Sequence, residues 1–230
     1  MKIGTPRELY EGEARVGMTP DSAQALQKLG NDCIVEAGAG KAAGFSDDAY
    51  RAAGVTVVDS ANALYAGSDI IAKVRPPETS EIDRLSSDKT LISFFYPAQN
   101  KDLLEQAKEK GANVIAMDMV PRISRAQKMD ALSSMANIAG YRAVIEAGNN
   151  FGRFFTGQVT AAGKVPPAKV LVIGAVVAGL AALGTATSLG PFTFAFAVLP
   201  AVAEQLDSTG AHFVCIDDAG DMYRSDTACK

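Results

Sequence analysis

Short apolar runs alternate with amphipathic stretches from the start of the chain to residue 117. Helices are predicted after capping residues Thr19, Ser46 and Ser60 and again over Lys101–Lys110, and the first three end at a glycine. The β-branched and apolar runs between them predict strands at 33–35, 55–58, 69–74, 90–95 and 113–117. Helices of about ten residues alternating with short strands are typical of a mostly parallel sheet with both faces covered.

The pattern changes after residue 129. A longer helix is predicted over Asp130–Asn149, and a polar, glycine- and proline-containing link over Thr160–Pro167. The candidate inward positions of this helix are Leu132, Met135, Ile138, Ala139 and Val144. We therefore predict an N-terminal α/β domain at 1–129, a connecting helix and linker at 130–168, and a second domain at 169–230.

Val170–Ala203 contains no charged residue and allows two interpretations. A membrane span needs about 20 apolar residues, and the stretch could supply one. Against this, Gly190-Pro191 interrupts the run, what remains is too short for a return span, and Lys169 has no basic neighbours. A buried strand at 170–173, a turn at Gly174, a helix at 177–189, a strand at 193–198 and a helix at 200–206 explain the order better, so we favour a βαβ unit.

The turn of this βαβ unit carries part of a dinucleotide-binding fingerprint, G-x-G-x-x-G. Gly174 and Gly179 occupy its first and third glycine positions, but Val176 occupies the second, where the pyrophosphate approaches the backbone. The acid that should hold the ribose is missing as well, because the stretch is uncharged up to Glu204. The candidate contacts of the turn are Gly174, Ala175, Val176, Val177 and Gly179. From spacing alone, a βαβ unit that has kept its fold and lost its ligand is an equal alternative.

Composition narrows the class of protein. A chain of 230 residues with 48% apolar and 21% charged residues and a net charge of −4 gives no basic surface for nucleic acid. Three distant cysteines, no CxxC and a single histidine, His212, predict neither a disulfide framework nor a metal site. No apolar export segment follows Met1, so we expect a cytoplasmic location.

Five motifs carry a resemblance to a known family: Gly4–Glu8, Gly12–Val16, Lys73–Pro77, Tyr96–Asn100 and, above all, Pro121–Ser134. On these motifs the chain resembles the alanine dehydrogenase/transhydrogenase family, in particular the NAD(H)-binding N-terminal part of the proton-translocating NAD(P) transhydrogenase alpha subunit. The resemblance extends over the whole length. It implies two Rossmann-like α/β domains with mostly parallel sheets, the second of them incomplete in this chain and with an exposed sheet edge.

The resemblance assigns roles to the 121–134 loop. It places an arginine, a glutamine, an aspartate and a serine near the nicotinamide and its ribose, and these fall on Arg122, Gln127, Asp130 and Ser133. Such groups suit a cofactor that needs its ring amide and hydroxyls oriented. Without the resemblance, Asp130 and Ser133 would be interpreted as helix caps and Arg122 as a solvated side chain.

The same resemblance separates two branches of the family. Arg15 and Lys73 match positions that bind the substrate carboxylate in alanine dehydrogenases, whereas the catalytic histidine of those enzymes falls at Tyr96. An acid–base group for amino-acid oxidation is thus missing, which favours the transhydrogenase branch. The implied reaction is direct hydride transfer between NAD(H) here and NADP(H) on a partner domain, coupled to proton passage through a membrane domain, with no catalytic side chain and no metal.

The resemblance implies a homodimer that binds membrane and NADP(H)-binding domains or subunits. The chain itself would lie at the cytoplasmic face of the membrane and would not insert into it. Two positions motivate an alternative. The family has a glycine at Val176 and an aspartate at Ala197. We therefore also consider a degenerate, non-catalytic relative with impaired NAD binding, acting as a pseudoenzyme or an interaction module.

Overall fold

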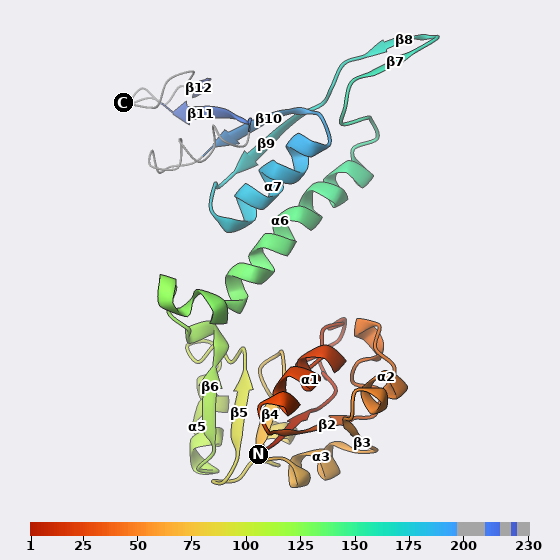
Figure 1. Cartoon of the computed structure of the whole chain (residues 1–230). Coiled ribbons are helices and arrows are strands. Elements are labelled where there is room, and N and C mark those ends of the chain that lie inside the picture. Colours follow the sequence, from red (N-terminus) through yellow and green to blue (C-terminus); the bar gives the residue numbers. More distant parts are fainter. Residues whose placement is uncertain (197–209, 217–221, 225–230) are drawn as a thin grey trace. The chain divides into compact units, whose positions relative to one another are not determined.

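The computed structural model describes residues 1–196, 210–216 and 222–224. The chain divides into two compact units, Met1–Asp130 and Ala131–Lys230 (Figure 1). Each has its own sheet and its own apolar core.

The first unit is built on a parallel six-stranded sheet of order β3-β2-β1-β4-β5-β6. Its strands are β1 (Lys2–Thr5), β2 (Asp32–Glu36), β3 (Thr56–Val58), β4 (Ile70–Ala72), β5 (Thr90–Ser93) and β6 (Asn113–Ala116). Its helices are α1 (Pro20–Lys28), α2 (Asp47–Ala52), α3 (Ala61–Gly67), α4 (Thr79–Ile82) and α5 (Lys101–Glu109), with 3-10 turns η1 (Lys41–Ala43), η2 (Met117–Met119) and η3 (Ser124–Met129).

Residues of β2 alternate between two cores, as a strand buried on both faces requires. Cys33 and Val35 pack with Tyr50 from α2, while Ile34 packs with Leu64 from α3. Both faces of the sheet are therefore covered, which confirms the predicted α/β class.

The capping residues act as predicted. Thr19, Ser46 and Ser60 each accept a hydrogen bond from a backbone N–H in the first turn of their helix. Strand β1 was not predicted from the sequence, because Gly4 in its middle is a poor strand former. The structure explains this glycine: a Cβ there would overlap the hydroxyl of Ser68.

The second unit contains a four-stranded sheet of order β12-β11-β10-β9. Strands β9 (Lys169–Ile173), β10 (Phe192–Phe196) and β11 (His212–Ile216) are parallel, and β12 (Met222–Arg224) is antiparallel to β11. Helix α7 (Val177–Ser188) joins β9 to β10 and packs on α6 (Ala131–Asn150). The predicted strand–turn–helix–strand order is confirmed up to Phe196; the rest of that strand, with Ala197, and the predicted helix at 200–206 lie outside the described residues.

Two details of the second unit differ from the sequence analysis. The 160–167 segment is not a plain link, because β7 (Gln158–Thr160) and β8 (Gly163–Val165) form an antiparallel hairpin that includes part of it (Figure 1). The inward face of α6 is also different: Val144 is buried as predicted, but Ile138 and Ala139 are exposed. The reason is Gly140, which lies against the backbone of Ala178 so closely that a Cβ would overlap its carbonyl oxygen.

No helix among residues 1–196, 210–216 and 222–224 combines the length and the apolar character that crossing a membrane requires. Within the described part of the charge-free stretch, residues 170–196, the helix is α7, which has 12 residues.

Candidate functional site

Gly174 makes the turn between β9 and α7. Its φ is +96°, in the left-handed region that favours glycine, and its N–H donates to the carbonyl oxygen of Phe196 at 2.9 Å. Nothing lies within 4 Å of the place where a Cβ would stand. Backbone conformation, and not lack of space, therefore selects glycine at this position.

Gly179, in the first turns of α7, is selected by close packing. A Cβ at Gly179 would overlap the carbonyl oxygen of Gly174. The helix therefore lies directly against the turn, which is the role of the third glycine in a dinucleotide-binding fingerprint. Two of the three glycine roles are thus present in the geometry of this chain.

Val176 is the N-cap residue of α7. Its carbonyl accepts the N–H of Leu180 at 2.8 Å, while its side chain makes no cap hydrogen bond and is 64% exposed. The first turn of α7 carries no acidic side chain, so the partial positive charge of the helix N-terminus is not offset there. A helix N-terminus of this kind favours an anion, and the exposed side chain of Val176 stands at that terminus.

The two neighbouring turn residues face the protein. Ala175 is buried in a core with Leu183 and Ala195, and Val177 is half-buried. Among the predicted contacts of the turn, the exposed positions are therefore Gly174 and Val176. These two positions offer backbone at Gly174 and a valine side chain at Val176.

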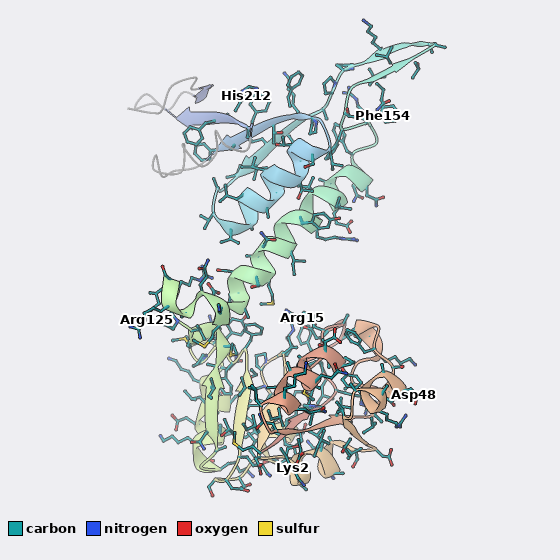
Figure 2. The ribbon with its side chains drawn as sticks, in the orientation of Figure 1. Lys2, Arg15, Asp48, Arg125, Phe154 and His212 are labelled. Atoms are coloured by element: carbon teal, nitrogen blue, oxygen red, sulfur yellow. The ribbon has the colours of Figure 1, made fainter. Side chains whose placement is uncertain are left out.

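The predicted nicotinamide-contacting residues lie on one continuous segment. Arg122 and Gln127 are exposed, Gln127 within η3, and Asp130 is half-buried between η3 and α6. Ser133 is half-buried in the first turn of α6. Buried Ala126 anchors the segment, and Arg125 beside it extends from η3 (Figure 2). Arg122, Gln127 and Asp130 thus lie at the end of the first unit, and Ser133 lies at the start of the second.

Lys73 is buried in the first unit between two carboxylates. Its Nζ lies 2.6 Å from Glu81 and 3.7 Å from Glu8. The hydroxyl of Tyr65 donates to Glu81 at 3.3 Å, and burial together with this carboxylate raises the pKa of Tyr65. The charge of Lys73 is therefore already balanced within the protein, which leaves it poorly suited to bind a substrate carboxylate.

A second ion-pair group lies on the loop before α1. Arg15, labelled in Figure 2, and Arg75 both bind the carboxylate of Glu13, with closest distances of 2.7 and 2.6 Å. These guanidinium groups, Arg15 first, hold the pKa of Glu13 at about 2. The Arg75 guanidinium also stacks 4.5 Å from the centre of the Tyr10 ring. The loop is thereby fixed to the segment that follows β4.

A cavity of about 290 Å³ opens beside these groups at the carboxyl ends of β1, β4 and β5. Tyr96 is half-buried in its wall and has a φ of +49°. The carboxylate of Asp118 holds this strained backbone by accepting the N–H groups of Phe95 and Tyr96 at 2.6 and 3.0 Å. The lining residues are Leu9, Tyr10, Lys73, Arg75, Pro76, Glu78, Tyr96 and Asn100.

The sequence analysis missed Glu8, Glu13 and Glu81 as partners of these cations. A signal was present, because Glu8 and Glu13 stand in two of the quoted motifs and Lys73 begins a third. The structure joins the motifs: Glu8 accepts the N–H groups of Val74 and Arg75 at 2.6 and 3.2 Å. Three motifs that are far apart in sequence thus form one network.

Two family models match the chain. The alanine dehydrogenase/PNT N-terminal domain matches residues 4–139, and the alanine dehydrogenase/PNT C-terminal domain matches residues 143–228. Among curated proteins, the NAD(P) transhydrogenase subunit alpha of Cereibacter sphaeroides is 74% identical over 94% of this chain and 42% of its own length. The same subunit of Haemophilus influenzae is 57% identical over 97% of this chain and 44% of its own.

A solved structure agrees with these matches. The transhydrogenase from Sinorhizobium meliloti superposes with a TM-score of 0.90 at 40% identity, covering 94% of this chain and 64% of that one. The chain spans less than half the length of the two curated relatives. By both family models and by these identities, the chain belongs to the alanine dehydrogenase/PNT family.

Proposed function

We propose that this chain is the NAD(H)-binding part of an NAD(P) transhydrogenase alpha subunit. Hydride passes between NAD(H) held here and NADP(H) held by a partner domain, and proton passage through a membrane domain is coupled to that exchange. The observation that carries the proposal is the packing of Gly179 against the Gly174 turn at the start of α7. This geometry fits a pyrophosphate, whose charge the helix N-terminus favours.

Each unit carries groups whose chemistry suits one part of the cofactor. The first-turn N–H groups of α7 would hold the pyrophosphate, while Arg122, Gln127, Asp130 and Ser133 would orient the nicotinamide and its ribose. The bound nicotinamide itself supplies the hydride chemistry. The chain's task is to position the ring and to leave its reactive carbon accessible to the partner.

Tyr96 supports the transhydrogenase branch over amino-acid oxidation. Oxidation of an amino acid needs an acid–base group and a free cation for the carboxylate. At the Tyr96 cavity the buried cation, Lys73, is paired with Glu81 and Glu8. Direct transfer between two nicotinamides needs neither group.

One feature favours weakened binding. The exposed, branched side chain of Val176 stands at the N-cap, where a glycine would let phosphate oxygens reach the backbone. We propose that Val176 lowers the affinity for NAD(H). In the alternative, a non-catalytic relative, this loss is complete.

Isotope transfer tests the reaction. The chain is mixed with the NADP(H)-binding domain of the Cereibacter sphaeroides enzyme, NADH deuterated at the transferable position, and NADP⁺. We expect NADPH that carries the deuterium. NADPH without deuterium, or no NADPH above the level given by the partner domain alone, contradicts direct hydride transfer.

A further inference from the structure

A polar cavity of about 340 Å³ lies within the first unit, apart from the groups assigned to the cofactor. Its lining comes from the ends of three neighbouring parallel strands: Pro6 and Arg7 follow β1, Glu36 ends β2, and Asp59 follows β3. Residues of α3 and α4 also line it. In open α/β sheets, ligands bind outside the carboxyl ends of the strands, which is where this cavity lies.

The polar cavity is distinct from the cavity that Tyr96 lines. Lys73 lines the Tyr96 cavity and its buried partner Glu81 lines the polar cavity, so their ion pair of 2.6 Å contributes to the walls of both. The volume of the polar cavity lies at the lower end of the range of roughly 300–1,000 Å³ that is typical of small-molecule sites. Its size therefore favours a small ligand over a dinucleotide.

Arg7 is held in place by a buried carboxylate. Both oxygens of Glu36 are used, because Oε2 accepts the backbone N–H of Arg7 at 3.0 Å and Oε1 accepts its Nε–H at 3.1 Å. Among the described residues, the two Nη groups of Arg7 have no partner. The protein therefore orients this guanidinium group and leaves its outer N–H groups available to a ligand.

A second guanidinium group, that of Arg84, is oriented by three contacts. Its Nε–H donates to Oδ1 of Asn62 at 2.7 Å, its Nη1 donates to the carbonyl oxygen of Ser80, and its centre lies 6.0 Å from the centre of the Tyr65 ring. Within the described part of the chain it pairs with no carboxylate, and its Nη2 has no hydrogen-bond partner. Two fixed guanidinium groups with unused donors thus line one cavity, an arrangement that suits an anion with several oxygen atoms.

The carboxylates in the lining differ in what they can still bind. Glu36 is neutralised by Arg7, and Glu81 is neutralised by Lys73. Asp59 is exposed, and its side chain has no partner among residues 1–196, 210–216 and 222–224. One carboxylate of the cavity can therefore still accept hydrogen bonds from the hydroxyl groups of a ligand.

We propose that the polar cavity binds a small sugar phosphate. A phosphate ester carries up to about two negative charges and three terminal oxygens, which match two guanidinium groups better than the two oxygens of a carboxylate do. The sugar hydroxyls donate to Asp59, whereas inorganic phosphate has no sugar to meet that side chain. The inference concerns the first unit alone and does not rest on NAD(H) binding.

Titration of the full chain with ribose 5-phosphate tests the proposal, and inorganic phosphate and ribose are the comparison probes. Calorimetry gives the three affinities, and NMR spectra of the arginine Nε–H groups identify the side chains that respond. We expect saturable binding of ribose 5-phosphate at one site, at least about tenfold tighter than binding of either comparison probe. The Nε–H signals of Arg7 and Arg84 should shift during this titration.

Two variants of the cavity and one control sharpen the test. Arg84→Gln removes one guanidinium group and should weaken ribose 5-phosphate binding at least about tenfold. Asp59→Asn should lower the preference for ribose 5-phosphate over inorganic phosphate at least about threefold, because a neutral amide accepts hydroxyl hydrogen bonds less strongly than a carboxylate. Arg51→Gln, at an exposed arginine of α2 that pairs with Asp48 outside the cavity lining, should leave all affinities unchanged. Circular dichroism checks the fold of each variant, and the exposed Asp59 position keeps the test decisive if Arg84→Gln does not fold.

Three results would overturn the proposal. The first is the absence of ribose 5-phosphate binding at millimolar concentration. The second is an equal affinity for inorganic phosphate, which would reduce the cavity to a general anion site. The third is an affinity for ribose 5-phosphate that is the same in folded Arg84→Gln, or a preference over inorganic phosphate that is the same in Asp59→Asn, as in Arg51→Gln.

Dialysis of NADH against Arg84→Gln separates this proposal from the proposed function. The variant should bind NADH as the unaltered chain does, because Arg84 lies outside the groups assigned to the cofactor. A weaker NADH affinity in this variant would assign the polar cavity to the cofactor and would overturn the sugar phosphate site. Absence of NADH binding in both proteins would contradict the proposed function and leave the ribose 5-phosphate results unaltered.

Discussion

Gly179 packs directly on the carbonyl group of Gly174, so that a Cβ on Gly179 would overlap the Gly174 oxygen. The backbone of α7 therefore begins in contact with the turn that precedes it. This relationship sets the distance between helix and strand, and it brings the first-turn N–H groups of α7 beside an exposed glycine.

Gly179→Ala should therefore destabilise the second unit. The added methyl group has to displace backbone, so we expect a loss of about 2 kcal/mol or more in the free energy of unfolding. Gly184→Ala, in the same helix, is the matched control. Nothing lies within 4 Å of its Cβ position, so it should stabilise by about 0.5–1 kcal/mol. Urea unfolding followed by circular dichroism measures both, and equal effects would contradict the packing argument.

Removal of the Lys73 charge should destabilise the first unit strongly. Lys73→Met leaves the buried carboxylates of Glu81 and Glu8 without their cation, at a cost of about 3–5 kcal/mol. Lys108→Met removes an exposed lysine that pairs with exposed Glu105 and should cost less than about 1 kcal/mol. Chemical denaturation compares them. A loss below 1 kcal/mol for Lys73→Met would contradict a stabilising role of the Lys73 ion pairs in the fold.

The lowered pKa of Glu13 predicts that the stability of the fold decreases at acidic pH. Its pKa falls from 4.5 to about 2 on folding, so its contribution is complete above pH 4.5 and is lost as the pH falls toward 2. Glu13→Gln should remove about 1–3 kcal/mol at neutral pH and should make the slope of stability against pH shallower below 4.5. Unfolding midpoints measured across this range test the prediction, and parallel curves for the two proteins would contradict it.

Local signals in the sequence predicted most of the first unit. Thr19, Ser46 and Ser60 cap their helices because their side chains and sequence neighbours suffice for that role. Long-range contacts were harder to predict. Strand β1 contains a glycine, Gly4, because Ser68 leaves no room for a Cβ, and Ile138 faces outward because Gly140 packs against Ala178.

In the candidate site, too, local features could be predicted from the sequence and long-range contacts could not. The left-handed turn at Gly174 could be predicted from the glycine spacing, since the conformation is local. The contact of Lys73 with Glu8 joins segments that are far apart in the sequence, as does the hydrogen bond from the N–H of Val74 to Glu8, 66 positions away. A single sequence contains no direct signal for such a pairing, although the motifs that hold these residues marked their importance.

We expect that removal of the Val176 side chain raises the affinity for NADH. Val176→Gly removes the branched side chain at the N-cap of α7 and should raise NADH affinity by about tenfold, corresponding to about 1.4 kcal/mol. Val159→Gly is the control, because Val159 is similarly exposed but lies on the hairpin. It should leave the dissociation constant unchanged.

Equilibrium dialysis of NADH against the purified chain tests the central claim most directly. The account predicts saturable binding at one site per chain, weaker than in Val176→Gly and equal to that in Val159→Gly. No binding at millimolar NADH, in the unaltered chain and in Val176→Gly alike, would contradict the assignment of this chain as the NAD(H)-binding part of a transhydrogenase.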